Sequence, residues 1–273
     1  MTVFDLERPI RGETPVLVEI PHAGLEIPET YRSEIVVSPK SIRSDADIYV
    51  DELYRGATYR GATVLAARYS RYVVDLNRAQ DDLDAETVRD HPSAKPHQPR
   101  GVVWRITIDG DRCMPQPLSR ARFETRLDAC YRPYHGAIAS ELVRLRERFG
   151  HAILVAAHSM PSVGRIGHAD SGVRRADVVP GTRGRTTAHP SIIDLVDSHF
   201  RAAGLSVRHD QPYRGGFSTR HYGRPKESWH AIQIELNRAL YVDETTHERK
   251  EADLERLRQL LLGLVEKLGT LRL

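Results

Sequence analysis

The sequence lacks features that several large protein classes require. Its 273 residues include only two cysteines, Cys113 and Cys130, without a short metal-type spacing, so we expect reduced thiols in a cytosolic protein. No stretch approaches the roughly 18 continuous apolar residues of a membrane span. The first residues are partly acidic and no apolar run follows a basic start, which predicts no signal peptide and a cytoplasmic location.

Several enzyme signatures are missing as well. The chain has neither a GxxxxGK[ST] phosphate loop nor a GxSxG turn, which disfavours a serine hydrolase of the latter type. Neither cysteine lies at the end of an expected strand, so a cysteine nucleophile is not predicted. Basic residues are scattered among acidic ones, with no aromatic-interleaved basic stripe, and we expect no nucleic-acid partner.

The composition is that of an ordinary globular protein. Hydrophobic residues make up 40% of the chain, enough for a sizeable core, and charged residues 28%, with a net charge of only +3. Arginine far outnumbers lysine, which favours a small anionic substrate because the guanidinium group grips carboxylates through two hydrogen bonds. A codon bias toward arginine is the competing interpretation for the surface arginines.

Apolar runs alternate with amphipathic segments along the whole chain. Strands are predicted at 14–20, 62–69, 71–77, 101–111, 151–158, 205–210 and 230–238. Helices are predicted at 41–61, 119–149 with a kink or division at Pro133, 189–204 and 246–269, and loops at 79–100, 160–189 and 211–223. This order predicts one α/β domain over residues 1–273, a mixed, mostly parallel sheet flanked by helices.

Two histidines stand at the ends of apolar runs, where α/β folds place their chemistry. His22 follows VLVEIP, and His158 ends HAILVAA. Two imidazoles with one carboxylate would suit zinc, although each histidine alone is more often a hydrogen-bonded structural group. The carboxylate could come from the acidic cluster of Asp45, Asp47 and Asp51 or from Glu26. A helix N-terminus attracts aspartates by itself, so this choice stays open.

A further carboxylate and several arginines complete the candidates. Glu235 lies inside the apolar run QIEL, where a carboxylate is costly unless it is paired or functional, and a base beside a metal needs such a group. Arg71 could polarise a carbonyl oxygen, Arg78 with Asn77 could hold a carboxylate, and Arg220 lies on a glycine-rich segment that could close over a ligand. Each arginine alone is more often structural.

Seven segments in this order resemble one family. They are PHAG at 21–24, SDAD at 44–47, SRYVVDLNR at 70–78, PYH at 133–135, AHS at 157–159, GGFSTRHYG at 215–223 and HAIQIEL at 230–236. From about Val16 to about Glu244 the chain resembles the N-formylglutamate amidohydrolases, which look distantly similar to zinc carboxypeptidases. That resemblance implies a mixed eight-stranded sheet flanked by helices.

The resemblance also implies an activity and a set of roles. Zinc would be held by His22, Asp47 and His158, and Glu235 would act as general base. The resemblance places Arg71 at the polarised carbonyl, and it assigns the substrate carboxylates to Asn77, Arg78 and, in support, Arg220. The implied reaction converts N-formyl-L-glutamate to formate and L-glutamate, a step of histidine degradation.

Two departures keep alternatives open. Leu25 stands where the carboxypeptidases have the glutamate of their His-x-x-Glu ligand pair, and the loop at 160–189 is more basic than expected of a deformylase. A related zinc amidase or carboxypeptidase-like enzyme with another N-acyl amino acid or a short peptide as substrate is the alternative enzyme. A carboxylate-binding protein without catalysis is the alternative outside enzymes.

Overall fold

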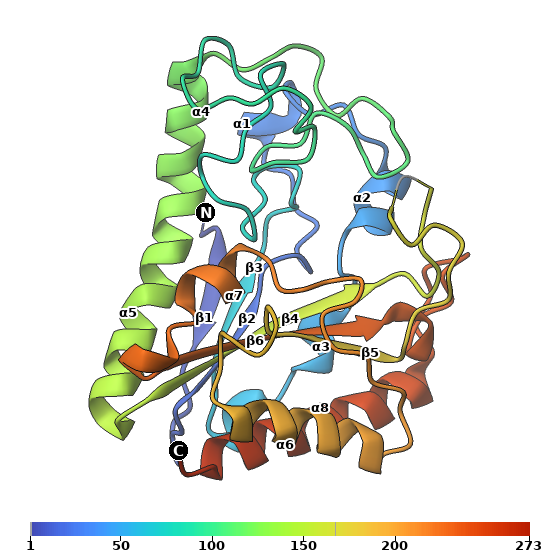
Figure 1. Ribbon diagram of the computed structural model, residues 1–273. Helices are drawn as coiled ribbons and strands as arrows, with labels where there is room; N and C mark the ends of the chain where they lie inside the picture. Colours follow the sequence, from blue (N-terminus) through green and yellow to red (C-terminus); the bar gives the residue numbers. More distant parts are fainter. Residues whose placement is uncertain (1, 167) are drawn as a thin grey trace. The chain divides into compact units, whose positions relative to one another are not determined.

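The apolar runs form a sheet in the computed structural model, which describes residues 2–166 and 168–273 (Figure 1). Its strands are β1 (Phe4–Glu7), β2 (Val16–Ile20), β3 (Thr63–Ala67), β4 (Ala152–Met160), β5 (Val178–Gly181) and β6 (Trp229–Asn237). They lie in the order β1-β3-β2-β4-β6-β5. Strands β3, β2, β4 and β6 are parallel, and β5 is antiparallel to β6. The predicted mixed, mostly parallel sheet is confirmed, although the described residues form six strands and not the eight that the resemblance implied.

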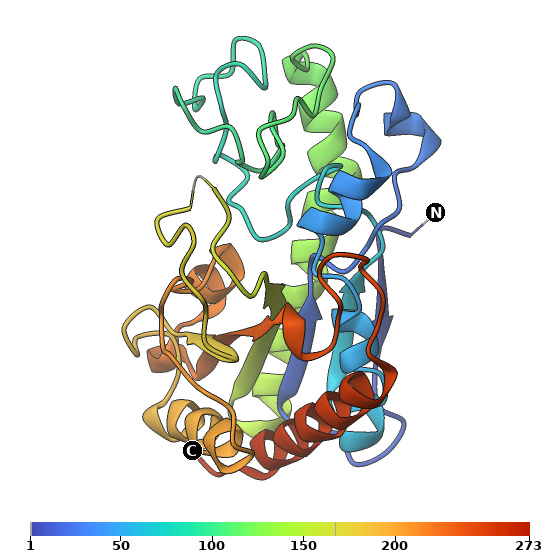
Figure 2. The same cartoon turned by 90° about the vertical axis from the view of Figure 1, so that its right-hand side faces the viewer.

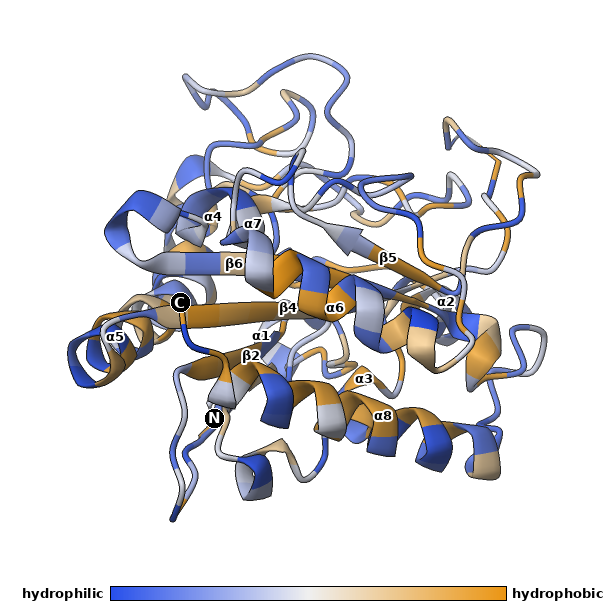
Figure 3. Ribbon diagram, turned by 60° about the horizontal axis from the view of Figure 1, so that its bottom comes forward, coloured by the Kyte–Doolittle hydropathy of each residue, from blue (hydrophilic) through white to orange (hydrophobic). Residues whose placement is uncertain are grey.

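Strand β4 lies inside the sheet because it is apolar along most of its length (Figure 3). All of its residues are buried, as expected for a parallel strand covered on both faces. Helices α6 (Pro190–Ala202) and α8 (Glu251–Thr270) lie side by side below one face, and α7 (Phe217–Tyr222) contacts β4 and β6 from the other (Figures 1 and 2). No helix of the described residues is both long and apolar enough to cross a bilayer.

Contacts along the chain divide it into two compact units. The first contains the described residues of 1–5, 21–48 and 67–137, with helices α1 (Glu29–Arg32), α2 (Pro39–Asp45) and α4 (Arg120–Arg126). The second contains those of 6–20, 49–66 and 138–273. It holds nearly all of the sheet, helices α3 (Val50–Leu53), α6, α7 and α8, most of α5 (Arg132–Phe149), and short 3-10 turns at Ala57–Arg60, Pro225–Glu227 and Arg238–Leu240.

The single helix predicted at 41–61 is wrong. Helix α2 ends at Asp45, because Ala46 is extended, and α3 begins only at Val50. Between them Tyr49 has a left-handed backbone with φ of 65°, which interrupts the helical hydrogen bonds. The break leaves Asp47 between the two helices and not inside one.

The strands predicted at 71–77 and 101–111 are also wrong. Residues 71–77 form turns, although most of them are buried as the apolar run suggested. Within this segment the Asp75 side chain accepts the backbone N–H of Asn77 at 3.0 Å, a local bond that replaces sheet pairing. Residues 101–111 make only isolated bridges, among them one between Arg100 and Trp104. The apolar pattern predicted the burial of these segments correctly, but it predicted the wrong backbone conformation.

The long helix predicted at 119–149 is present in three parts. Helix α4 continues through a π turn at Leu127–Tyr131 into α5. The N–H of Arg132 bonds to the carbonyl of Leu127, so one extra residue is accommodated directly before Pro133. The expected division near Pro133 therefore takes the form of a π turn.

Of the remaining predictions, most are confirmed and three are wrong in part. The strands predicted at 14–20, 62–69, 151–158 and 230–238, the helices at 189–204 and 246–269 and the loop at 79–100 are confirmed. The loop at 160–189 contains β5, and that at 211–223 contains α7, so both are wrong in part; Gly167 lies outside the described residues. The strand at 205–210 is reduced to one bridge between Val178 and Val207.

A buried histidine at the start of β6 makes the fold sensitive to acid. The pKa of His230 is lowered to about 4, because burial disfavours the charged ring and because His151 and His189 lie nearby. The rings of both neighbours are 6.3 Å from that of His230, and its Nδ1 has no hydrogen-bond partner. Protonation here would place a positive charge in a buried position beside two further histidines.

We therefore expect stability to fall between pH 6.5 and about 4. In that window the unfolded chain binds a proton at His230 that the native state does not, so the contribution is complete above 6.5 and lost on acidification. Urea unfolding at about pH 7.5 and about pH 5 should show a loss of roughly 1–2 kcal/mol that His230→Phe abolishes. His97→Gln, at an exposed site, is the control. Equal losses in the wild type and in His230→Phe would contradict the assignment.

Candidate active site

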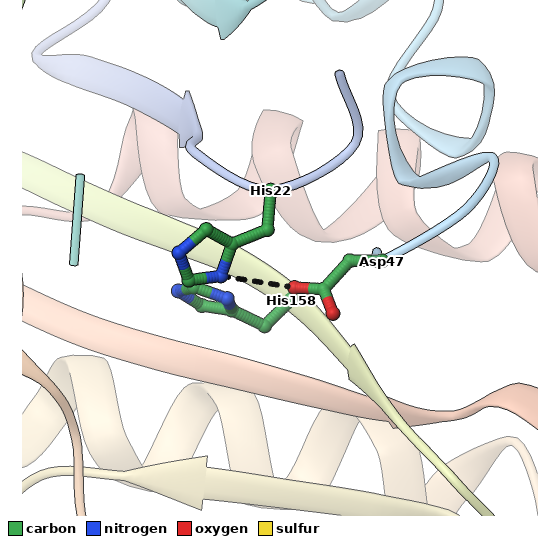
Figure 4. Close-up of side chains that lie close together, drawn as sticks. All are labelled: His22, Asp47 and His158. Carbon is green, nitrogen blue, oxygen red and sulfur yellow. Dashed lines mark ion pairs between the residues drawn. The ribbon is translucent and has the colours of Figure 1, made fainter. Parts of the chain in front are cut away.

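The first predicted ligand, His22, lies just past the end of β2 and is 3% exposed. Its Nε2 lies 2.8 Å from Oδ1 of Asp75, and its Nδ1 lies 3.5 Å from Oδ2 of Asp47 (Figure 4). Because Asp75 can only accept, Nε2 carries the ring proton, and Nδ1 presents its lone pair on the side of Asp47. The turn after His22 requires Gly24, because a Cβ there would come within 2.4 Å of the Arg68 backbone.

Of the acidic candidates, Asp47 is the one that faces His22. It is 4% exposed, and its backbone N–H donates to the carbonyl of His22 at 2.9 Å, which ties the two segments together. Asp45 is equally buried but serves the fold, since its Oδ2 accepts the Tyr72 hydroxyl at 2.6 Å and the N–H of Ile108 at 3.0 Å. Glu26 is exposed and lies 3.5 Å from Arg68.

A residue that the sequence analysis missed, Asp75, orients His22. It is fully buried and accepts hydrogen bonds from Arg71 Nη2 at 2.7 Å and from Trp104 Nε1 at 3.0 Å, besides that from His22. Burial alone would raise the pKa of Asp75, but the charge of Arg71 and the hydrogen bond with His22 hold it well below its ordinary range. A carboxylate on the second ring nitrogen is the usual support of a metal-binding histidine. The signal was available in YVVDL, a carboxylate in an apolar run.

Arg71 is held in place by two aspartates. Its Nε and Nη2 donate to Oδ2 of Asp75, its Nη1 donates to the carbonyl of Asp45 at 3.1 Å, and its guanidinium lies 4.4 Å from the Trp104 ring centre. Burial lowers the pKa of Arg71, but Asp75 and Asp47 outweigh this and raise it, so the side chain stays charged. The role predicted for Arg71, polarisation of a carbonyl, stays a prediction.

The predicted carboxylate-binding pair follows Asp75 in a tight turn. Two groups from the start of the long helix fix that turn: the Tyr131 hydroxyl donates to the carbonyl of Arg78 at 2.8 Å, and His135 Nε2 contacts the carbonyl of Leu76 at 3.0 Å. Arg78 itself is partly exposed and lies 4.0 Å from Asp82. Asn77 and Arg78 therefore sit on a rigid turn, and their predicted role is untested.

The other predicted site residues, His158, Glu235 and Arg220, belong to the second unit. His158 on β4 and Glu235 on β6 are register partners, 3% and 6% exposed. Gln233 Nε2 donates to Oε1 of Glu235 at 2.8 Å. Arg220 lies on helix α7, and not on a loop as predicted, and is exposed. The roles of Glu235 and Arg220 stay predictions.

One group of the described residues has the composition of a metal site. His22, Asp47 and His158 are all buried, and each offers one ligand atom within 4.8 Å of the other two (Figure 4). Two imidazole nitrogens and one carboxylate oxygen are a common donor set for catalytic zinc, and Asp75 supplies the expected support of one imidazole. The residues present therefore fit a divalent metal.

Comparison with known proteins points in one direction. Residues 14–242 match the N-formylglutamate amidohydrolase family. The N-formylglutamate deformylase of Pseudomonas putida is 34% identical over 255 residues, 92% of this chain and 91% of that protein, and that of Pseudomonas aeruginosa is 34% identical over 265 residues, 94% of each. The crystal structure of an N-formylglutamate amidohydrolase from Ralstonia eutropha JMP134 superposes with a TM-score of 0.88 at 30% identity, covering 98% of both chains.

Proposed function

Because the chain belongs to the N-formylglutamate amidohydrolase family, we propose that it hydrolyses N-formyl-L-glutamate to formate and L-glutamate with a bound divalent metal. Two relatives that cover more than nine-tenths of the chain are named N-formylglutamate deformylase. The observation that carries the metal dependence is the buried group of His22, Asp47 and His158. The whole chain, 1–273, acts in this proposal as one catalytic domain.

His22, Asp47 and His158 would hold the metal, and zinc suits their donor atoms best. When bound, the ion supplies Lewis-acid activation of water and of the formyl carbonyl. Asp75 keeps the Nδ1 lone pair of His22 available for this purpose, because it fixes the ring proton on Nε2. The preference for zinc over other divalent metals belongs to the proposal.

Glu235 moves the proton in this mechanism. It accepts a proton from the attacking water as the oxygen adds to the formyl carbon, and returns it to the amide nitrogen as the C–N bond breaks. Its near-complete burial suits the task, because it shields the proton transfer from bulk water. Arg71 stabilises the negative charge that develops on the carbonyl oxygen.

We assign the binding of the substrate carboxylates to Asn77 and Arg78, in the turn after Asp75, and to Arg220 on α7. Asn77 and Arg78 bind one carboxylate, and Arg220 supports the binding. The buried ion pair of Arg71 with Asp75 leaves the partly exposed Arg78 and the exposed Arg220 as the better placed cations for a ligand that arrives from solvent.

Metal content and product release test the proposal together. We expect about one zinc per chain, loss of turnover after dialysis against a chelator, and recovery on adding zinc. Formate should be released from N-formyl-L-glutamate, with kcat/KM at least about tenfold higher than for the N-acetyl and N-succinyl analogues, because each misfit group costs about 1–3 kcal/mol. A metal-free protein of full activity, or equal rates on all three compounds, would overturn the proposal.

A further inference from the structure

Three polar side chains are buried in the sheet on the face that α7 covers. Glu19 on β2, Gln233 on β6 and Glu235 on β6 are 0%, 3% and 6% exposed. Glu19 and Gln233 lie in one row across the sheet, because both are register partners of Ala156 on β4. Burying a carboxylate or an amide costs free energy unless its hydrogen bonds are made. Packing alone therefore does not explain these three side chains.

The amide of Gln233 has its orientation fixed from two sides. The backbone N–H of Gly216 can only donate, and it lies 2.8 Å from Oε1 of Gln233, so the amide oxygen faces Gly216. The NH2 group consequently faces Glu235 and donates to its Oε1 at 2.8 Å. Neither a carboxylate nor a hydrocarbon at position 233 could satisfy both partners, since one contact needs an acceptor and the other a donor.

The hydrogen bond between Gly216 and Gln233 also attaches the segment that carries Arg220. Gly216 immediately precedes α7, and Ser218, within α7, donates its hydroxyl proton to Oε1 of Glu19 at 2.7 Å. Hydrogen bonds to Gln233 and to Glu19 thus attach the start of the helix to the sheet. Gln233, in addition, donates to Glu235.

We propose that Gln233 is a positioning residue. It fixes the orientation of the Glu235 carboxylate for proton transfer and links this carboxylate, through hydrogen bonds, to the start of α7. This inference rests on the proposed function, in which Glu235 moves the proton. A hydrogen bond to Oε1 fixes the plane of the carboxylate, and a charge-assisted bond of this kind is stronger than a neutral one. Loss of this bond widens the range of orientations of the carboxylate, of which only a fraction is productive.

The test compares two variants, each of which removes one hydrogen-bonded attachment of α7 to the sheet. Gln233→Met keeps the length of the side chain and removes the hydrogen bonds to Gly216 and Glu235, whereas Ser218→Ala removes the hydrogen bond to Glu19 and leaves Gln233 in place. We expect Gln233→Met to lower kcat about tenfold or more with unchanged zinc content. Ser218→Ala should raise KM for N-formyl-L-glutamate and change kcat less than about twofold, because the bond to Glu235 remains.

A double-mutant cycle separates positioning from a structural role. In a Glu235→Gln background, Gln233→Met should change the residual kcat less than about twofold, since the group it orients is gone. Gln233→Glu, which keeps the volume and the acceptor for Gly216, should lower kcat at least as much as Gln233→Met, because two carboxylates then face each other.

The outcomes are distinct. Normal kcat in Gln233→Met or Gln233→Glu, or an equal loss in the presence and absence of Glu235, would overturn the role of Gln233. Full turnover in Glu235→Gln alone would instead overturn the proposed base. A rise in KM of equal size in Gln233→Met and Ser218→Ala, with kcat unchanged in both, would show that Gln233 only holds α7.

Discussion

Replacing Glu235 by glutamine should lower kcat for formate release by about 10²–10⁴-fold while leaving the metal in place. The substitution keeps the shape of the side chain and its place on β6, but the amide cannot accept the proton that leaves the attacking water. Because Glu235 is outside the proposed ligand set, zinc content should equal that of the wild type. Zinc analysis and steady-state kinetics on N-formyl-L-glutamate measure the two quantities.

Glu141→Gln is the matched control, since it makes the same change at a buried carboxylate of the second unit. Glu141 is 1% exposed and accepts hydrogen bonds from Arg8 and Arg144, so its loss should reduce stability and not kcat. A similar loss of kcat in both variants would point to general destabilisation. Near-normal turnover in Glu235→Gln would remove the proton-transfer role and leave the metal site without its base.

The sequence predicted the parts of the candidate site that local pattern determines. His22 and His158 were recognisable because each ends an apolar run, and Glu235 because it interrupts one. The same reasoning applied to VLVEI and to YVVDL would have identified Glu19 and Asp75, which prove as buried as Glu235. A carboxylate inside an apolar run is therefore an informative signal here, whatever the backbone of the run becomes.

The parts that could not be predicted depend on tertiary hydrogen bonds. The choice of Asp47 over Asp45 is visible only once Tyr72 and Ile108 are seen to bind Asp45, and both lie far from it in sequence. The break between α2 and α3 contains an extended Ala46 and a left-handed Tyr49, which no propensity indicates. Helix α7 forms within a glycine-rich segment that local composition marks as a loop.

Loss of the charge at Asp75 should have the second large effect, and it should be seen in metal affinity. Asp75→Asn puts one oxygen and one NH2 group where His22, Arg71 and Trp104 all donate. With its oxygen turned to Arg71 and Trp104, the asparagine presents NH2 to Nε2 of His22, so the ring is no longer held in the tautomer that presents Nδ1. We expect zinc affinity to fall about 10–100-fold, in the range found when a supporting carboxylate is removed. The asparagine also leaves Arg71 without its ion pair, which should cost roughly 3 kcal/mol of stability.

The two consequences of Asp75→Asn can be measured apart. Competition with a chromophoric chelator, at a temperature where circular dichroism shows the variant folded, reports affinity alone, and urea unfolding of the metal-free protein reports stability alone. Asp128→Asn, which removes an exposed aspartate paired with Arg132 in the same unit, should change neither by much. If Asp75→Asn bound zinc like the wild type and lost only stability, Asp75 would serve the fold through Arg71 and Trp104. The alignment of His22 would then have to come from its contact with Asp47.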